Sequence, residues 1–393
     1  MHDKRFQTYL IMLYAYFSVG CMVLAANTAL EFMIKDFGWS DSQGGLFISF
    51  LSLGNLASSI FTGMLCKGIG RKRVIILYGM LLFVCYMLMS VLNLPMVFYP
   101  LALLSGLYWG GINSITNTTI TELYSNSGSK LNICNACYGV GAVLLPLLLS
   151  LIVSRGGSWR TCFRIVAMLG LLMAVLAWVR PIPEMKVATP AANEKGASKP
   201  LAFWKELPFY LGAVLFFCYV GVESSASSWL PSYLSQYNSS FTEIPSATIV
   251  SLLWLTLIIG RLLCAGPGAK IDCKKLIVVL SCGFLLGVIG MVCFVKNTVL
   301  LLAAVVLTGL SMSGMYASCV ANSSRYVANS PLGAGILFGM GGLGSTVIPY
   351  VAGLVSDNAG LRVGMTSLCV FLICMLVAAV VNLNHSPAKE HKA

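Results

Sequence analysis

Between two long apolar runs the sequence reads Gly63-Met-Leu-Cys-Lys-Gly-Ile-Gly-Arg-Lys-Arg73. The flanking runs, 44–66 and 74–91, are each long enough to cross a bilayer, which takes about 20 apolar residues in a helix. The quoted segment carries four positive charges and no negative one. Short loops of this kind stay on the cytoplasmic side of a membrane. We therefore expect a tight cytoplasmic loop, in which the three glycines let the chain turn between two closely packed helices.

The same pattern occurs a second time in the chain. Counting 203 residues on from Gly63 reaches Gly266, which opens a second basic segment. The same step pairs Gly106 with Gly309, Gly111 with Gly314, Gly141 with Gly344 and Pro146 with Pro349. One ungapped offset that aligns so many features indicates an internal repeat, so the chain consists of two similar halves. In a membrane protein, such a repeat is typical of a secondary transporter.

The composition excludes several classes of protein. The chain is 58% hydrophobic and 10% charged, whereas a soluble domain is about 25% charged. We place 19 of the 25 Lys and Arg on the cytoplasmic side. Such an uneven distribution of basic residues orients a membrane protein, so the net charge of +12 indicates no nucleic-acid partner. The three histidines lie near the termini, and the 14 cysteines show no metal-ligand spacing. We therefore expect no enzyme activity, no metal site and no bound cofactor.

The fold class that follows is an all-α membrane protein with twelve transmembrane helices in two six-helix halves, related by a pseudo-two-fold axis. The spans are expected at 8–33, 43–66, 73–93, 97–123, 132–154, 161–180, 207–234, 245–267, 274–294, 298–321, 331–354 and 362–384. Residues 1–180 form the first bundle, 181–206 a polar cytoplasmic linker, and 207–393 the second bundle. We expect a monomer in the inner cell membrane, with lipid around it and both termini in the cytoplasm.

Polar side chains within the spans are candidates for a binding site, because at membrane depth they are costly unless they face the bundle interior or water. Asn113 and Asn117 are four residues apart and share one helix face. Asn135 and Tyr138 of the next span could lie on the same side. Amide groups offer both donors and acceptors, which suits a neutral polyhydroxy ligand. The alternative is that these amides only hydrogen-bond neighbouring helices.

The first span carries Asn27 and Glu31. We expect Glu31 to pair with Lys35 at the outer edge of the membrane, one turn further on. Asn27 lies deeper and is the better candidate for contact with a ligand.

The second half adds Glu223, Trp254 and Tyr316 to the candidate site. Glu223 is the most deeply placed carboxylate, and we find no basic residue at mid-membrane to pair with it. Such a group could carry a proton or ligate sodium, so Glu223 is the candidate coupling residue. The alternative is a neutral acid that hydrogen-bonds Tyr316 or Trp254, as in a uniporter. The glycine and serines around it, from 221 to 227, favour a loosened helix.

A second group of residues is expected at the cytoplasmic edge. Lys67 should pair with Glu122, since both flank short loops at that edge. Arg261 closes its span and is interpreted as a gate or scaffold charge. The whole group consists of Gly63, Lys67, Gly70, Arg71, Glu122 and Arg261.

These features together resemble the major facilitator superfamily over nearly the whole chain. The family's signature loop is matched here by Gly63, Leu65, Gly70, Arg71 and Lys72, whereas Lys67 stands at the usual acidic position. A lysine there is similar to the fucose and glucose/galactose symporter branch, as are Leu131-Asn132, Gly141-Ala142 and Tyr219-Val-Gly-Val-Glu223. Where the fucose symporters carry acids in spans 1 and 4, this chain has Asn27 and Asn113, so their role in proton coupling does not carry over.

The resemblance implies a secondary active transporter that moves a small polar solute, a monosaccharide first of all, with a proton or sodium ion as coupling cation. Export of drugs or other small organic solutes is the alternative, and a membrane sensor of the same fold that transports nothing is a third reading. Movement of labelled solute across a bilayer would separate the sensor from either transporter.

Overall fold

The fold is known from a computed structural model, which describes residues 2–124, 127–180, 182–183, 206–238, 246–265, 271–323 and 331–385. All secondary-structure elements in these residues are helices. Twelve helical segments of the described part are long and apolar enough to cross a membrane. The expected all-α architecture with twelve spans is therefore confirmed.

The helices overlap every expected span. The first half contains α1 (His2–Phe37), α2 (Asp41–Ile69), α3 (Arg71–Val91), the short helix η1 (Pro95–Val97), α4 (Phe98–Leu123), α5 (Ser127–Ser154) and α6 (Arg160–Val179). The second half contains α7 (Leu207–Tyr237), α8 (Ala247–Ala265), α9 (Cys273–Cys293), α10 (Thr298–Ser313), α11 (Met315–Asn322), α13 (Pro331–Ala359) and α14 (Leu361–Asn384). Most of the expected linker 181–206 lies outside the described residues.

The two halves repeat the same helix pairings. In the first half α1 packs against α5, α2 against α4 and α3 against α6; in the second half α7 packs against α13, α8 against α10 and α9 against α14. The repeated glycines lie at these crossings. A Cβ on Gly106 would lie 2.1 Å from the carbonyl oxygen of Leu51, and one on Gly309 would lie 2.5 Å from that of Leu253. Small residues at these points allow the helix backbones to touch.

The basic segment differs from the expected loop. α2 continues to Ile69 and α3 begins at Arg71, so the turn consists of Gly70 alone. Gly70 has a φ of 91°, a conformation that side chains disfavour and glycine adopts freely. Gly63 and Gly68 lie inside α2 and take no part in the turn. The corresponding Gly266 lies outside the described residues.

The expected single span at 298–321 is divided. α10 ends at Ser313 and α11 begins at Met315, with Gly314 between them. A Cβ on Gly314 would lie 2.6 Å from the Cys264 sulfur, so α8 passes very close at the break. The close approach requires a glycine, and a glycine also weakens the helix at that point.

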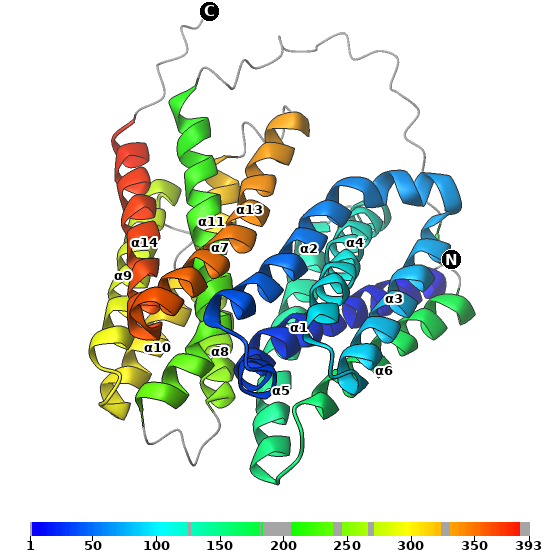
Figure 1. Cartoon of the computed structure of the whole chain (residues 1–393). Helices are drawn as coiled ribbons and strands as arrows, with labels where there is room; N and C mark the ends of the chain where they lie inside the picture. The colour runs from blue at the N-terminus through cyan, green and yellow to red at the C-terminus, as the bar shows by residue number, and fades with distance from the viewer. Residues whose placement is uncertain are drawn as a thin grey trace, which may run out of the picture.

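The halves meet at one end of the helices. α2 packs against α13, α5 against α8 and α1 against α7. We name this end, which carries Asp41, the Asp41 end, and the opposite one the Arg71 end. The hydrogen bonds that join described residues of the two halves all lie toward the Asp41 end. Figure 1 shows the two bundles close together at the lower side of the view and splayed apart at the upper side.

The glycine crossings predict a specific loss of stability. Gly106→Ala should lower the melting temperature of the detergent-solubilised protein, because its Cβ would overlap the Leu51 carbonyl oxygen and overpacking costs about 1–3 kcal/mol. Gly63→Ala is the control, since no atom lies within 4 Å of its Cβ position. Equal melting temperatures for the two variants would contradict the close crossing.

Candidate substrate site

Two charged side chains lie at the same depth in the second half. Glu223 is fourteen residues from the end of α7 at Tyr237, and Arg261 is fourteen residues from the start of α8 at Ala247. Because an α-helix rises about 1.5 Å per residue, each lies about 21 Å from the Asp41 end. The positive charge of Arg261 acts on the Glu223 carboxylate. The two groups attract each other at a distance. The direct ion pairs among the described residues are Lys35–Glu31 and Arg71–Glu122.

The nearness of Arg261 to Glu223 corrects a sequence expectation. We expected no basic residue at the depth of Glu223, because Arg261 stands near the end of its span in the sequence. The packing of α7 and α8, together with the long Arg side chain, brings the guanidinium within electrostatic range. Arg261 therefore belongs with the candidate site rather than with the residues around Arg71.

Aromatic rings from both halves lie beside these charges. Tyr138 of α5 and Trp254 of α8 have ring centroids 5.6 Å apart with an interplanar angle of 54°. The charges of Glu223 and Arg261 both act on the Tyr138 hydroxyl. The group thus lies where the two halves of the chain face each other.

Tyr316 of α11 is a further member of this group. Its ring contacts Phe216 of α7, at a centroid distance of 5.6 Å, and stacks on Phe338 of α13 at 6.4 Å. The Glu223 charge acts on its hydroxyl, and 45% of the residue surface is exposed. The structure therefore brings four predicted site residues together: Tyr138, Glu223, Trp254 and Tyr316.

The amides of α4 connect to this group through a residue of α1. The Tyr16 hydroxyl donates a hydrogen bond to Oδ1 of Asn117 at 2.9 Å. Tyr16 also lies within electrostatic range of Tyr316, which belongs to the other half. Asn113 lies one turn before Asn117 on α4, and its Oδ1 is buried with no hydrogen-bond partner among the described residues.

Two of the other buried polar atoms that lack a hydrogen-bond partner in the described part of the chain lie in or beside this group. They are the indole Nε1 of Trp254, a donor, and the hydroxyl of Ser227. Buried polar groups in proteins almost always have partners, so these atoms are available to a ligand or water. α7 itself is continuous from 207 to 237, so the expected loosening around Glu223 does not occur.

Two predicted candidates lie apart from this group. Asn27 is buried in α1, one turn from Glu31. Asn135 is exposed on α5, and its amide donates to the Leu131 carbonyl oxygen of its own helix at 3.0 Å. No contact between described residues links either amide to Glu223.

The expected partner of Glu31 is confirmed. Lys35 pairs with its Oε1 at 2.7 Å. The other oxygen, Oε2, accepts a hydrogen bond of 2.6 Å from Ser246, in the opposite half.

Two tyrosines that were not predicted as site residues also contact this group. Tyr16 binds Asn117, and Tyr219, which is 1% exposed, interacts with Glu223 one turn further along α7. The offset of 203 residues joins Tyr16 to Tyr219, so the repeat itself carried the signal.

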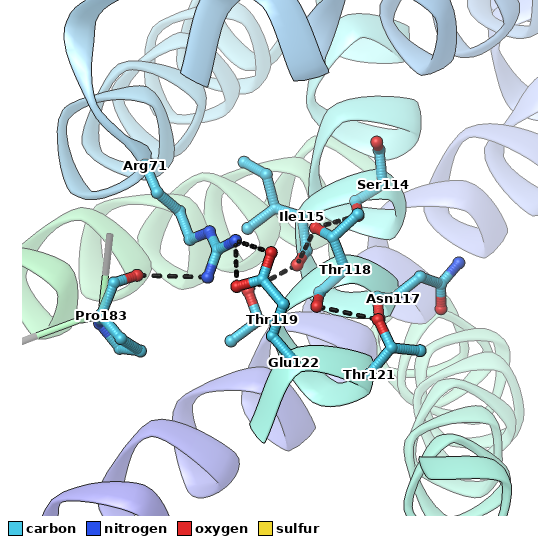
Figure 2. A network of polar contacts seen from close by, with 9 residues as sticks. All are labelled: Arg71, Ser114, Ile115, Asn117, Thr118, Thr119, Thr121, Glu122 and Pro183. Atoms are coloured by element: carbon cyan, nitrogen blue, oxygen red, sulfur yellow. Dashed lines mark hydrogen bonds and ion pairs between the residues drawn. The ribbon is translucent and has the colours of Figure 1, made fainter. Parts of the chain in front are cut away.

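Arg71 forms the central contact of the basic segment, and Figure 2 shows it facing Glu122. Its Nη2 lies 3.0 and 2.9 Å from the two Glu122 oxygens, and its Nη1 donates to the Pro183 carbonyl oxygen at 3.1 Å. The expected pairing of Lys67 with Glu122 is wrong. Lys67 is an exposed residue of the continuous α2, whereas the turn at Gly70 directs the fully buried Arg71 toward α4.

The same helix carries the ion pair and a site residue. Asn117 lies five residues before Glu122 on α4, on the side away from Arg71 (Figure 2). The Thr hydroxyls between them donate to carbonyl oxygens of their own helix, as Thr121 does to Asn117 at 2.9 Å. A displacement of α4 would therefore move the ion pair and the Asn117 amide together.

A family model identifies the protein class. The model of the Major Facilitator Superfamily matches residues 12–295 and 268–393. The chain belongs to the major facilitator superfamily. This confirms the family resemblance and the fold class, since members of the superfamily are transporters built from helices.

Within the superfamily, relatives with sugars in their names support the expected branch. The chain is 22% identical to the glucose/mannose transporter GlcP of Bacillus subtilis, over 93% of each chain. It is 22% identical to a glucose/galactose transporter of Brucella abortus, over 62% of this chain and 61% of that one. A gentisate transporter of Corynebacterium glutamicum is also 22% identical, over 95% and 87%. The solved D-xylose-proton symporter shares the fold, with a TM-score of 0.82 at 14% identity over 98% of each chain.

The Arg71–Glu122 ion pair predicts a second stability effect. Arg71→Gln should lower the melting temperature, because hydrogen bonds to charged groups contribute about 1.5–3 kcal/mol and Glu122 would keep its charge. Lys67→Gln also removes one basic residue of the segment, but at an exposed position, where substitutions change stability by about 0.5 kcal/mol or less. A larger fall in melting temperature for Lys67→Gln than for Arg71→Gln would instead support the Lys67–Glu122 pair expected from the sequence.

Proposed function

We propose that this member of the major facilitator superfamily is a secondary active transporter of a monosaccharide, coupled to a proton or sodium ion. The observation that carries the proposal is the match to a glucose/mannose transporter over 93% of both chains. No bound cofactor is required, because the gradient of the coupling cation supplies the free energy.

The chemistry of the candidate site supports a sugar. Asn113, Asn117 and Trp254 offer amide and indole groups, the first and last with unpaired buried atoms. Tyr138 and Tyr316 add aromatic rings that suit the C–H face of a pyranose. Ligand sites commonly combine apolar walls with a few placed polar groups. We include Asn27 and Asn135 in the proposed substrate-binding residues as side chains that would contact the sugar in another conformation.

The orientation follows from the basic residues. Short Lys/Arg-rich segments remain in the cytoplasm, so the Arg71 end is proposed to be cytoplasmic, with both termini. Because the halves are joined at the Asp41 end, this orientation would make the conformation one that faces the cytoplasm. Alternating access would open the Asp41 end to the outside. We propose that the protein works as a monomer in the inner cell membrane.

Arg261 favours one other cargo, a small organic acid. A guanidinium at membrane depth could bind a carboxylate, and one relative is named a gentisate transporter. Against this, Glu223 already attracts Arg261, which leaves less positive charge for an anionic substrate.

The two cargoes can be separated with purified protein in liposomes. We expect uptake of labelled glucose, mannose, galactose or xylose, driven by an imposed proton or sodium gradient, with no inhibition by gentisate. Gentisate uptake in the absence of sugar uptake would overturn the sugar assignment and favour the organic acid. Binding without any transport would indicate a sensor.

Glu223 is the proposed coupling residue. Glu223→Gln keeps the shape of the side chain and removes its change of charge, so it should abolish accumulation against a gradient while leaving substrate exchange measurable. Glu31→Gln is the control, since Glu31 is also a buried carboxylate but lies at the Asp41 end beside Lys35. Gradient-driven accumulation by Glu223→Gln would show that coupling runs through another residue.

Asn117 is the substrate contact with the clearest support. Asn117→Ala should weaken sugar binding by about 1–3 kcal/mol, because a sugar hydroxyl would lose its partner; this corresponds to roughly 5- to 150-fold in Kd. Asn358→Ala is a matched control, because its amide donates to the Leu354 carbonyl oxygen of its own helix and it is exposed. Titration calorimetry measures both, and an unchanged Kd in Asn117→Ala would exclude the contact.

A further inference from the structure

A carboxylate of the second half caps a helix of the first. Asp357 lies in the last turn of α13, and its two oxygens accept hydrogen bonds from the backbone N–H groups of Asp41 at 2.7 Å and Ser42 at 3.1 Å. In return, the Ser356 hydroxyl donates to the Asp41 carboxylate. These contacts lie at the Asp41 end, where the halves meet.

α2 also has a cap of its own. The Ser40 hydroxyl accepts from the Gln43 backbone N–H, and the Gln43 side chain accepts from the Ser40 N–H at 2.9 Å. This capping box leaves the next two N–H groups, those of Asp41 and Ser42, without an acceptor in their own helix. Asp357 accepts from both, so the start of α2 is completed by the other half of the chain.

The position of Asp357 is unfavourable within its own helix. The C-terminal turn of a helix carries partial negative charge, where an acidic side chain is destabilising and a basic one favourable. Against the start of α2 the same carboxylate meets partial positive charge and two unpaired donors. Its favourable contacts therefore exist only while the two halves touch at the Asp41 end. An interaction that is present in one conformation alone shifts the equilibrium toward that conformation.

The repeat shows that the fold does not need this carboxylate. The position that corresponds to Asp357 in the first half is Ser154, whose hydroxyl donates to the Leu151 carbonyl oxygen of its own helix. The matching contact between α5 and α8 uses neutral groups, with Thr248 donating to Ser150 at 2.8 Å. The charged cap is thus an addition to one side of a symmetric scaffold.

We propose that Asp357 is a latch: a positioning residue that holds the Asp41 end closed by capping α2 across the interface. The proposal rests on the alternating access of the proposed function, but on no particular cargo. Opening of the Asp41 end separates the carboxylate from the Asp41 and Ser42 amides, which then bind water. Asp357 should therefore set the balance between the two conformations.

Hydrogen–deuterium exchange of the substrate-free protein tests the latch. This method needs no cysteine-attached probe, which the 14 native cysteines of the chain would complicate. Asp357→Ala should speed exchange at the start of α2, residues 41–46, and also at the start of α8, residues 247–254, on the other side of the interface. Because Asp357 is exposed and water weakens its contacts, we expect an increase of about 3- to 10-fold at both places. Gln43→Ala, which removes the side chain that caps the Ser40 N–H within α2, should speed exchange at the start of α2 alone.

A second variant distinguishes loss of the latch from a general loss of folding. Asp357→Asn keeps the side-chain size and removes the charge, so it should give a smaller increase at the same two places, with exchange in α3 and α6 unchanged. Faster exchange confined to α2 in both Asp357 variants, or no change in either, would overturn the latch. Since no sugar is present, this outcome is independent of the outcome of the uptake experiments.

Discussion

Every part of this structure depends on one constraint: a backbone N–H or C=O group in hydrocarbon has no water to bind, so it must be paired within the protein. The chain meets this constraint with helices throughout its described residues. Hydroxyl side chains follow the same rule, as Ser225 does by donating to the Gly221 carbonyl oxygen of its own helix. Polar groups that remain unpaired, such as Nε1 of Trp254, are therefore informative about ligands.

The constraint also governs the charged groups. Arg71 is fully buried and is neutralised by Glu122, and the deeper Glu223 lies within range of Arg261. A charge without compensation at this depth would be costly. In the proposed coupling by Glu223, a bound cation would replace part of the attraction of Arg261, which would tie occupancy of the site to the packing of α7 against α8.

The internal repeat separates scaffold from function. Positions that fix helix crossings are the same in both halves, as with Gly106 and Gly309, because the backbones must approach equally closely in each. Positions that carry the proposed functions differ: Gly20 corresponds to Glu223, and Ser154 to Asp357. In the proposed transport cycle the two bundles of this symmetric scaffold would rock about their interface, and the asymmetric residues would set the cargo, the coupling and the preferred state.

The sequence by itself determined the twelve spans, the two halves and the family, because apolar length and a repeated offset are properties of the chain read in one dimension. It also placed Glu223 at mid-depth. Only the tertiary structure decided the partners. Whether Lys67 or Arg71 reaches Glu122 depends on where α2 ends. The position of the turn at Gly70 sets the direction in which the side chains after it point. Likewise, Arg261 lies within electrostatic range of Glu223, and Asp357 binds the Asp41 amide, because distant helices pack at matching depths, which spacing along the sequence does not encode.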